Sequence, residues 1–391
     1  WWHDMEVKKL KECCTIIAGQ SPESKYYNSN GDGLPFFQGK ADFGELYPSI
    51  RVYCSQPTKI AEKDDILLSV RAPVGPTNLA PCKVCIGRGL TAIRPSEVLL
   101  TRYVLLFFRY FEAQLASKGT GTTFKAITQD VVKNLEIPIP PLPEQERIVA
   151  RIEELFSQLD AGVETLKKTK VQLAVYRQAV LKEAFEGDYP RKQLKEFSKA
   201  ISGFAFKSSR YSPDGNYVVV KIGNVKERHF DFSRDLTKTL EADDSILEKY
   251  LLRRGDCLIT LTGSRGKRDY GFVAMVGNQN NYLLNQRVAA LRFDQSVALP
   301  EFFQYYLASP SYRDMFFGYE TGNVGQGNVG IKALLDPYVI LPDIDTQKRI
   351  IEDVEDRLSV CDSIEQTVDT ALQQAEAMRQ SILKDAFEGR L

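Results

Sequence analysis

Two long stretches of this chain place apolar residues at alternating steps of four and three, with polar residues between them. This spacing is typical of a helix whose apolar seam packs against a second helix. Pro143 precedes the first stretch and Gly187 follows it, which predicts one helix over residues 144–186, roughly 63 Å long. The predicted seam residues are Ile148, Ile152, Leu155, Leu159, Leu166, Leu173 and Val180 in the first stretch, and Ile350, Val354, Ile364, Val368, Met378 and Ile382 in the second.

The two stretches are copies of one sequence. Gln145 recurs as Gln347, and the Ala-Phe-Glu-Gly block at 184–187 recurs at 386–389, in each case 202 residues further along the chain. A repeat without insertions indicates two helices of matched length. We predict that they pack on each other as an antiparallel coiled coil. Arg357 falls at one seam position, where we expect the neighbouring Leu358 to take its place.

The segments beside the helices have a different pattern. Short β-branched runs, such as 66–70 and 258–261, alternate with Gly, Asn, Ser and Pro turns, and an aromatic-rich helical stretch follows at 102–116 and at 301–317. These segments match each other with an offset that grows from 184 to 202, which indicates loop insertions within a shared fold. The predicted fold class is α+β with a pseudo-twofold internal repeat. Its four parts are a strand-rich globular domain at 1–142, a helix at 143–189, a second globular domain at 190–341 and a second helix at 342–391.

Composition narrows the class of protein. Lys+Arg and Asp+Glu are both 51, yet residues 191–270 hold 17 basic and 11 acidic side chains, a local excess of six positive charges that suits an anionic partner. The chain has no apolar run of 18 residues, so we expect no membrane association. Seven cysteines form no dense framework, which favours a reduced, cytoplasmic protein.

The sequence offers no catalytic or metal site. Cys82 and Cys85 are the only Cys-x-x-Cys pair, and a structural zinc needs four ligands. We find no Walker A sequence, no methyltransferase box and no nuclease carboxylate cluster. We therefore expect a chain without catalytic residues and without a metal.

The order of globule, helix, globule and helix resembles the specificity subunit of type I restriction-modification systems. The segments that carry the resemblance are 137–149 (IPIPPLPEQERIV), 179–187 (AVLKEAFEG) with its repeat at 381–389, 64–75 (DDILLSVRAPVG) and 85–95 (CIGRGLTAIRP). The resemblance implies two target-recognition domains that read a bipartite, asymmetric site in double-stranded DNA. It also implies a helix pair that sets the spacer and docks two methyltransferase (M) subunits, with restriction (R) subunits completing the complex. S-adenosylmethionine, ATP and Mg²⁺ are then expected on the partner subunits, and no cofactor on this chain.

Candidate DNA-binding side chains come from the loops of both domains. The segment 262–268 is a glycine-containing basic loop after a predicted strand, and basic side chains there can reach guanine edges or phosphates. The candidates are Gln38, Lys40, Arg71, Lys118 and Thr122 in the first domain, and Lys207, Arg210, Lys221, Asn224, Lys226, Arg265, Lys267 and Arg268 in the second.

Two other functions are compatible with the same sequence. A coiled-coil scaffold could join two protein-binding heads, and a reader could serve a methyltransferase defence system that lacks a nuclease. DNA binding that weakens steeply with salt distinguishes a DNA reader from a scaffold.

Overall fold

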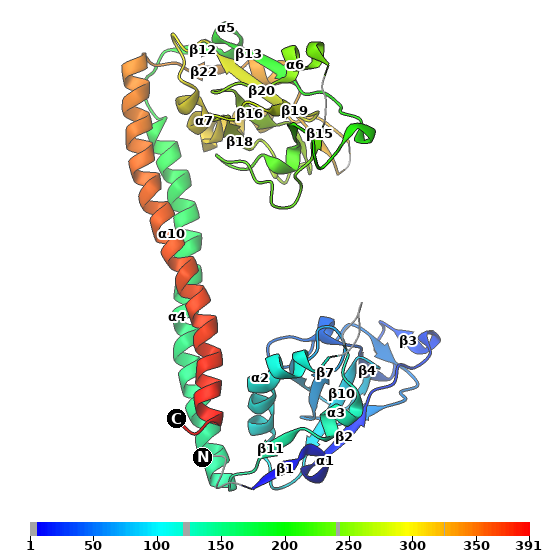
Figure 1. The fold of residues 1–391 in the computed structure, drawn as a ribbon. Coiled ribbons are helices and arrows are strands. Elements are labelled where there is room, and N and C mark those ends of the chain that lie inside the picture. Colours follow the sequence, from blue (N-terminus) through cyan, green and yellow to red (C-terminus); the bar gives the residue numbers. More distant parts are fainter. Residues whose placement is uncertain (1–5, 120–125, 240–242, 324) are drawn as a thin grey trace. The chain divides into compact units, whose positions relative to one another are not determined.

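The computed structural model describes residues 6–119, 126–239, 243–323 and 325–391. It divides into two compact units (Figure 1). The first contains Trp1–Lys167 and Asp369–Leu391, and the second contains Lys168–Val368. Each unit joins one globular head to a portion of both long helices, so the fold is α+β as predicted.

The first head is built on two sheets. One sheet is antiparallel, in the order β2 (Cys14–Ala18), β10 (Leu90–Pro95), β7 (Ile66–Ser69), β8 (Thr77–Leu79). The other has the order β3 (Tyr27–Asn28), β5 (Tyr53–Cys54), β4 (Leu34–Phe37), β9 (Val84–Ile86), β6 (Ile60–Ala61), with β4 and β9 parallel. The remaining strands are β1 (Val7–Lys9) and β11 (Glu136–Pro138), which pair with each other. The helices are α1 (Leu10–Cys13), α2 (Thr101–Ser117) and α3 (Gln129–Lys133), with short 3₁₀ turns at η2 (Ser24–Tyr26) and η3 (Lys40–Asp42).

The second head repeats this plan. Its antiparallel sheet has the order β13 (Ser198–Ser202), β20 (Val288–Phe293), β16 (Cys257–Thr260), β18 (Val273–Met275). A second sheet has the order β15 (Lys238–Thr239), β14 (Tyr217–Val220), β19 (Tyr282–Leu284), with β14 and β19 parallel. The remaining strands form the pairs β12 (Arg191–Gln193) with β22 (Tyr338–Ile340) and β17 (Thr262–Gly263) with β21 (Gly327–Asn328). The helices are α5 (Leu194–Phe197), α6 (Asp244–Tyr250), α7 (Pro300–Ala308), α8 (Pro310–Gly318) and α9 (Ile331–Leu335), with short 3₁₀ turns at η4 (Ser208–Arg210) and η5 (Ile222–Asn224).

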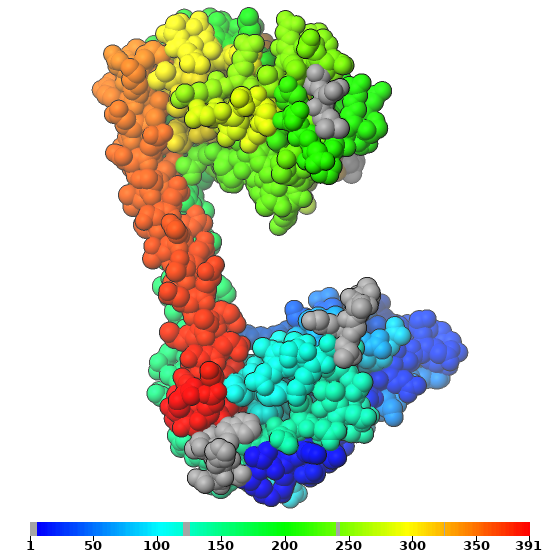
Figure 2. Space-filling model, in the orientation of Figure 1, coloured from blue at the N-terminus to red at the C-terminus, as the bar shows by residue number. Residues whose placement is uncertain are grey.

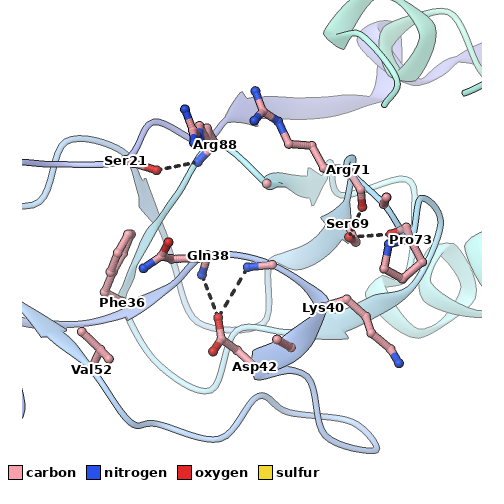
Figure 3. A pocket seen from close by; sticks show the side chains of 14 residues that line it. Ser21, Phe36, Gln38, Lys40, Asp42, Val52, Ser69, Arg71, Pro73 and Arg88 are labelled. Carbon is pink, nitrogen blue, oxygen red and sulfur yellow. Dashed lines mark hydrogen bonds between the residues drawn. The ribbon is translucent and has the colours of Figure 1, made fainter. Parts of the chain in front are cut away.

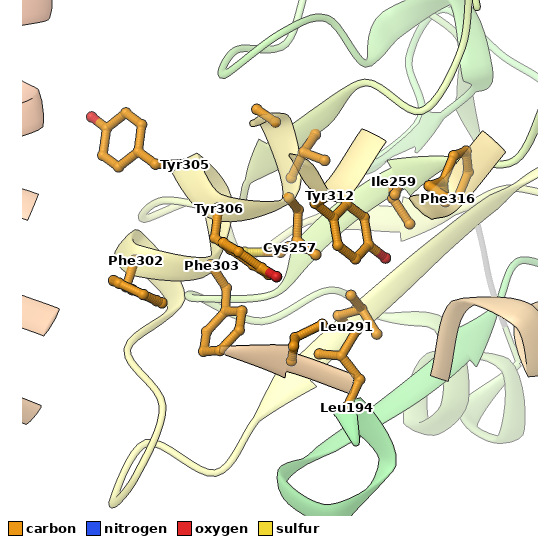
Figure 4. Packing of buried hydrophobic residues seen from close by; sticks show 14 of the residues in the cluster. Leu194, Cys257, Ile259, Leu291, Phe302, Phe303, Tyr305, Tyr306, Tyr312 and Phe316 are labelled. Atoms are coloured by element: carbon orange, nitrogen blue, oxygen red, sulfur yellow. The ribbon is translucent and has the colours of Figure 1, made fainter. Parts of the chain in front are cut away.

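One predicted helix is divided in the structure. The stretch 301–317 forms α7 and α8, which meet at Ser309 and Pro310. Proline cannot continue a helix because it lacks an N–H, and the Ser309 hydroxyl accepts the Tyr312 N–H at the start of α8. Aromatic side chains from α7 and α8, Phe303 and Phe316 among them, still fill one core (Figure 4).

The long helices are α4 (Leu142–Ala184) and α10 (Ile344–Phe387). Within each unit their portions run antiparallel (Figure 1), and the atoms of α10 pack directly against α4 (Figure 2). The ion pairs that fix this direction are Arg177 with Asp362 and Arg357 with Glu183 in the second unit, and Arg379 with Asp160 in the first.

The seam of α10 differs from the prediction at two positions. Ile364 and Met378 are 41% and 53% exposed, so their assignment to the seam is wrong. Glu365 and Arg379, one residue further along, are half-buried in their place.

The observed seam of α10 keeps the spacing of four and three. Its buried or half-buried residues are Val354, Leu358, Cys361, Glu365, Val368, Leu372, Ala375, Arg379 and Ile382. The predicted seam residues that are buried or half-buried are Ile148, Ile152, Leu155, Leu159, Leu166, Leu173, Val180, Ile350, Val354, Val368 and Ile382. Leu358 is buried, so it takes the seam position at which Arg357 interrupts the apolar spacing, as predicted.

The C-terminal end of each long helix inserts a phenylalanine into a head. Phe387 of α10 stacks on Tyr110 in the first head, with ring centroids 5.4 Å apart. Phe185, the residue directly after α4, meets Phe302 and Tyr306 edge-on in the second head, each at 5.3 Å. Burial of large aromatic surface explains why the Ala-Phe-Glu-Gly block is present in both copies.

The N-terminal end of each long helix is tied to its head by a buried glutamine. The Gln145 side chain accepts the Leu100 N–H at 2.8 Å and donates to the carbonyl oxygens of Val98 and Pro140. Gln347 makes the same three bonds, which run to Leu299, Val297 and Pro342. A buried amide that satisfies three backbone groups fixes the angle at which the helix leaves the head.

Candidate nucleic-acid interface

The two heads place their loops on the same backbone hydrogen bonds. The Gly87 N–H donates to the Phe37 oxygen in the first head, as Asn285 does to Val220 in the second. Three further bonds of the first head have equivalents in the second. Val70, Ile127 and Gly19 donate to the oxygens of Gly89, Val70 and Leu90, and in the same order Leu261, Val329 and Gly203 donate to those of Arg287, Leu261 and Val288. A residue in one head can therefore be assigned its structural equivalent in the other without reference to side-chain identity.

In both heads an ion pair between a buried aspartate and a partly exposed arginine links two strands of the antiparallel sheet, the start of β7 to the end of β10 and the start of β16 to the end of β20. Asp65 receives two hydrogen bonds of 2.8 Å from the Arg94 guanidinium, and Asp256 receives bonds of 2.7 and 2.6 Å from Arg292. Their carboxylates raise the pKa of both arginines above the usual value. These bidentate pairs occupy the fork of each guanidinium, so Arg94 and Arg292 act as framework residues.

A concavity of about 580 Å³ opens on the first head (Figure 3). Three strand-to-loop junctions contribute Gln38, Arg71 and Arg88 to its lining, and Lys40 also lies there. Figure 3 places Arg71 and Arg88 along one rim, with Gln38 across from them. The sequence prediction named Gln38, Lys40 and Arg71, which the structure brings together, but it missed Arg88.

The backbone around this concavity is fixed by side-chain hydrogen bonds. The Asp42 carboxylate accepts the N–H groups of Gln38 (2.8 Å) and Gly39 (3.4 Å). The Ser69 hydroxyl lies 3.1 Å and 2.8 Å from the carbonyl oxygens of Arg71 and Pro73. The Arg88 N–H donates to the Ser21 hydroxyl at 3.3 Å. Each exposed side chain on the rim thus projects from a held loop.

Arg71 and Arg88 present their guanidinium groups at the rim of this concavity. Both are exposed, and within the residues that the structure describes neither guanidinium has an ion-pair partner. The ammonium of Lys118 lies 5.4 Å from the centre of the Phe111 ring, at the end of α2. Thr122, the remaining candidate of this head, lies outside the described residues.

In the second head the basic loop 262–268 is held by its neighbours. Arg265 donates to the Gly322 oxygen at 2.8 Å, and Arg268 donates to Asp314 at 2.6 Å. Glu320 accepts the Gly266 N–H at 3.2 Å and the Tyr270 hydroxyl at 2.8 Å. Burial and the Glu320 charge raise the pKa of Tyr270, which therefore remains a hydrogen-bond donor.

Lys267 is the basic residue of this loop that stays available. Its side chain is exposed, and the described part of the chain offers it no ion-pair partner. The loop is therefore a fixed basic projection, in which Lys267 can reach a ligand without breaking a contact.

Two candidates of the second head serve its own structure. Asn224 is 1% exposed, accepts the Lys221 N–H at 2.9 Å and donates to the carbonyl oxygens of Asp231 and Asp235. All its hydrogen-bonding groups are used to hold a turn, so the prediction that its side chain contacts DNA is wrong. The Lys221 ammonium is bound by the Asp235 carboxylate at 3.0 Å.

The other candidates of this head lie apart from the loop. Lys207 and Arg210 line a hollow of about 240 Å³ together with Phe204 and Phe206, and Arg210 lies 3.7 Å from Asp243. Lys226 is half-buried, and its N–H donates to the His229 oxygen.

No cluster of three or more metal-binding side chains occurs among the described residues. Cys82 and Cys85 are free thiols, and Cys85 is buried in β9. None of the described helices has the length and apolar character needed to cross a bilayer.

The fold and its surface define a two-headed protein with a duplicated α+β domain, in which one backbone framework carries different exposed side chains in each copy. The family model described as "Type I restriction modification DNA specificity domain" matches residues 3–173 and again residues 186–374. The chain belongs to this family and contains its domain twice.

Individual relatives agree with the family match. The chain is 39% identical over 181 residues to the putative type I restriction enzyme MjaX specificity subunit of Methanocaldococcus jannaschii, a match that covers 46% of this chain and 42% of that protein. It is 27% identical over 332 residues to the type I restriction enzyme EcoKI specificity subunit of Escherichia coli, covering 80% and 70%.

Two solved structures share the fold. A chain from a structure described as the basis of complex assembly and conformational transition of the type I R-M system has a TM-score of 0.75 at 20% identity, covering 99% of this chain and 98% of that one. The HsdS subunit from Thermoanaerobacter tengcongensis has a TM-score of 0.54 at 20% identity, covering 99% and 97%.

Proposed function

We propose that this chain is the DNA sequence-specificity subunit of a type I restriction-modification complex. Each head reads one half of a bipartite site, and the α4–α10 pair sets the spacer between the halves. The observation that carries the proposal is that equivalent positions of the two heads project different hydrogen-bond donors, such as Arg88 in one and Gln286 in the other. Two heads with the same backbone framework but different hydrogen-bond donors are suited to read a DNA site whose two halves differ in sequence.

Electrostatics supports DNA as the ligand. Arg71, Arg88 and Lys267 are exposed cations for which no carboxylate partner exists within the described residues. Unpaired cations on loops can neutralise phosphates and release counterions, and they can donate to the edges of guanine. A head that binds another protein through an apolar face does not need them.

The outer faces of the helices support docking of methyltransferase subunits. In the second unit, Val171 and Val175 of α4 are 67% and 66% exposed and lie one turn apart. Val360 and Ile364 are exposed at the same spacing on α10. Exposed apolar residues at steps of four form a stripe into which a partner helix can pack.

The chemistry of the complex belongs to the partners in this proposal. Two methyltransferase subunits bring S-adenosylmethionine, and restriction subunits bring ATP and Mg²⁺, so this chain contributes recognition and no catalytic group. A complex that acts on the DNA of its own cell works in the cytoplasm, where the seven free cysteines stay reduced.

The test is methylome sequencing of cells that express this chain together with its methyltransferase. We expect methylation at one bipartite motif with two different halves, and loss of that motif when this chain is deleted. Purified chain should bind the motif with an affinity that falls steeply between 50 and 200 mM salt. A methylome without such a motif, together with salt-insensitive binding, favours the protein scaffold instead.

A further inference from the structure

Three positions that line the concavity of the first head have equivalents in the second head. The first pair follows β4 and β14 and consists of Gln38 and Lys221. The second pair is Arg71 and Thr262, which directly follow the hydrogen-bonded residues Val70 and Leu261. The third pair is Arg88 and Gln286, which lie in the turns before β10 and β20. We refer to these as the three reading positions.

The backbone brings these positions together by the same contacts in both heads. The turn before β10 bonds to Phe37 on one side, through Gly87, and to Val70 on the other, through Gly89. In the second head Asn285 and Arg287 make the corresponding bonds to Val220 and Leu261. The three junctions are therefore neighbours in both heads, whatever side chains they carry.

A glycine in each head allows this approach. A Cβ added to Gly19 would collide with the carbonyl oxygen of Gly87, and one added to Gly203 would collide with that of Asn285. The turn that carries Arg88 or Gln286 can thus lie against the end of β2 or β13 only because Gly19 and Gly203 lack a side chain.

We propose that the three reading positions determine which bases each head recognises, an inference that rests on the proposed DNA-reading function. In the first head, Arg71 and Arg88 read guanines through O6 and N7, and Gln38 reads an adenine through N6 and N7. Base reading needs a guanidinium on a fixed backbone with its donors free, and both arginines meet this requirement.

The second head carries a different set at the same positions. Gln286 stands where the first head has Arg88, and its exposed amide reads an adenine. Thr262 replaces Arg71, and Lys221 is held by Asp235 and Thr237. At these three positions the second head therefore specifies fewer guanines than the first, and Lys267 adds a phosphate contact.

The experiment exchanges residues between the heads. The variants Arg88→Gln and Arg71→Thr introduce the side chains that the second head already carries on the same backbone, so the fold is expected to tolerate them. Arg191→Gln, a change of an exposed arginine in β12, is the matched control. Each full-length protein is assembled with its methyltransferase subunits and used to select sites from a randomised DNA library.

We expect Arg88→Gln and Arg71→Thr each to remove the guanine preference at one position of the first half-site and to leave the second half-site unchanged. Binding of the wild-type site should weaken roughly 10- to 100-fold, as for the loss of one bidentate base contact. The control should select the wild-type site with its affinity intact.

Other outcomes overturn the inference. If Arg88→Gln and Arg71→Thr weaken binding equally for all sequences and lower the salt slope by about one, the arginines contact phosphates. If they select the wild-type site unchanged, the reading positions lie elsewhere. If the unmodified protein selects no bipartite site, the proposed function itself fails, which is a separate result.

Discussion

The Arg177 guanidinium of α4 donates to the Asp362 carboxylate of α10 at 2.6 Å, across the exposed edge of the helix pair in the second unit. Arg379 and Asp160, each 202 residues away from its counterpart, form the same pair in the first unit. The duplication of the sequence thus extends to an interaction between copies, in which each arginine reaches a carboxylate on the other helix. Such a pair fixes the register of two helices that apolar contacts alone would leave free to slide.

We predict that the Arg177–Asp362 pair has a measurable coupling energy. Arg177 is half-buried and also donates to Glu365 at 2.7 Å, whereas Asp362 is largely exposed, so solvent weakens the interaction. A double-mutant cycle with Arg177→Met and Asp362→Asn, followed by chemical unfolding, should give about 1 kcal/mol. A coupling energy of zero would show that the seam holds its register without this pair.

The buried glutamines should matter more than any exposed one. Gln145→Ala leaves the Leu100 N–H and two carbonyl oxygens without their partner, which we expect to destabilise the first unit by about 2–4 kcal/mol. Gln347→Ala should cost the second unit a similar amount, because it breaks the same bonds. Hydrogen exchange of each unit measures this, with the exposed Gln172→Ala as control; equal protection in all variants would contradict the prediction.

Glu112 should make the first unit sensitive to pH. Burial raises the pKa of its carboxyl above the ordinary 4.5, against the opposing charges of Arg109 and Lys40. Because the folded protein holds this proton more tightly than the unfolded chain, the stabilisation is present below pH 4.5 and is lost as the pH rises through the folded pKa.

Glu112→Gln should therefore unfold at a higher temperature than the wild type near neutral pH, and the difference should vanish below pH 4.5. Thermal unfolding at several pH values measures the difference, with the exposed Glu97→Gln as the control. A constant difference at all pH values would show that packing, and not titration, separates the two proteins.

The seam shows what the sequence could predict. Most core positions of the helix pair followed from apolar spacing, yet Ile364 and Met378 are exposed while Glu365 and Arg379 take their seam positions. A spacing rule counts only apolar residues, so it cannot recognise a charged seam residue that is neutralised by the opposite helix.

The sequence predicted which loops form the candidate site better than it predicted which residues of those loops are available to a ligand. Asn224 looked like a surface donor because its role in a turn depends on Asp231 and Asp235, which reach it only after folding. Arg88 was missed because it lies between two glycines in a short turn. Its signal was in the repeat, since the strands at 90–94 and 288–292 match at an offset of 198, which aligns Arg88 with Gln286.

The apolar stripe on α4 should be required for assembly and not for folding. Val171→Ser with Val175→Ser changes two exposed side chains, so unfolding should stay within about 0.5 kcal/mol of the wild type. Capture of the methyltransferase should nevertheless weaken at least tenfold, as judged by co-purification and titration. The exposed Val98→Ser in the first head is the control, and undiminished capture would place the partner on another surface.

The proposed spacer role of the helix pair makes a prediction about distance. Removing residues 160–166 from α4 and 373–379 from α10 takes one heptad from each helix and deletes Asp160 together with Arg379, so neither charge loses its partner. Seven helical residues span about 10 Å, which corresponds to about three base pairs. If the helices set the spacing, the double deletion should shorten the unread spacer by about three base pairs while both half-sites keep their sequences.

Methylome sequencing measures the spacer length and the two half-site sequences in one experiment. Deletion of residues 160–166 alone is the control, because it moves one side of the seam by a heptad and removes Asp160, the partner of Arg379. This single deletion should abolish methylation at either spacer length. An unchanged spacer in the double deletion would mean that the partners or the DNA set the distance between the half-sites. A change in the half-site sequences would instead assign base reading to the helices, because the deletion leaves the loops of both heads intact.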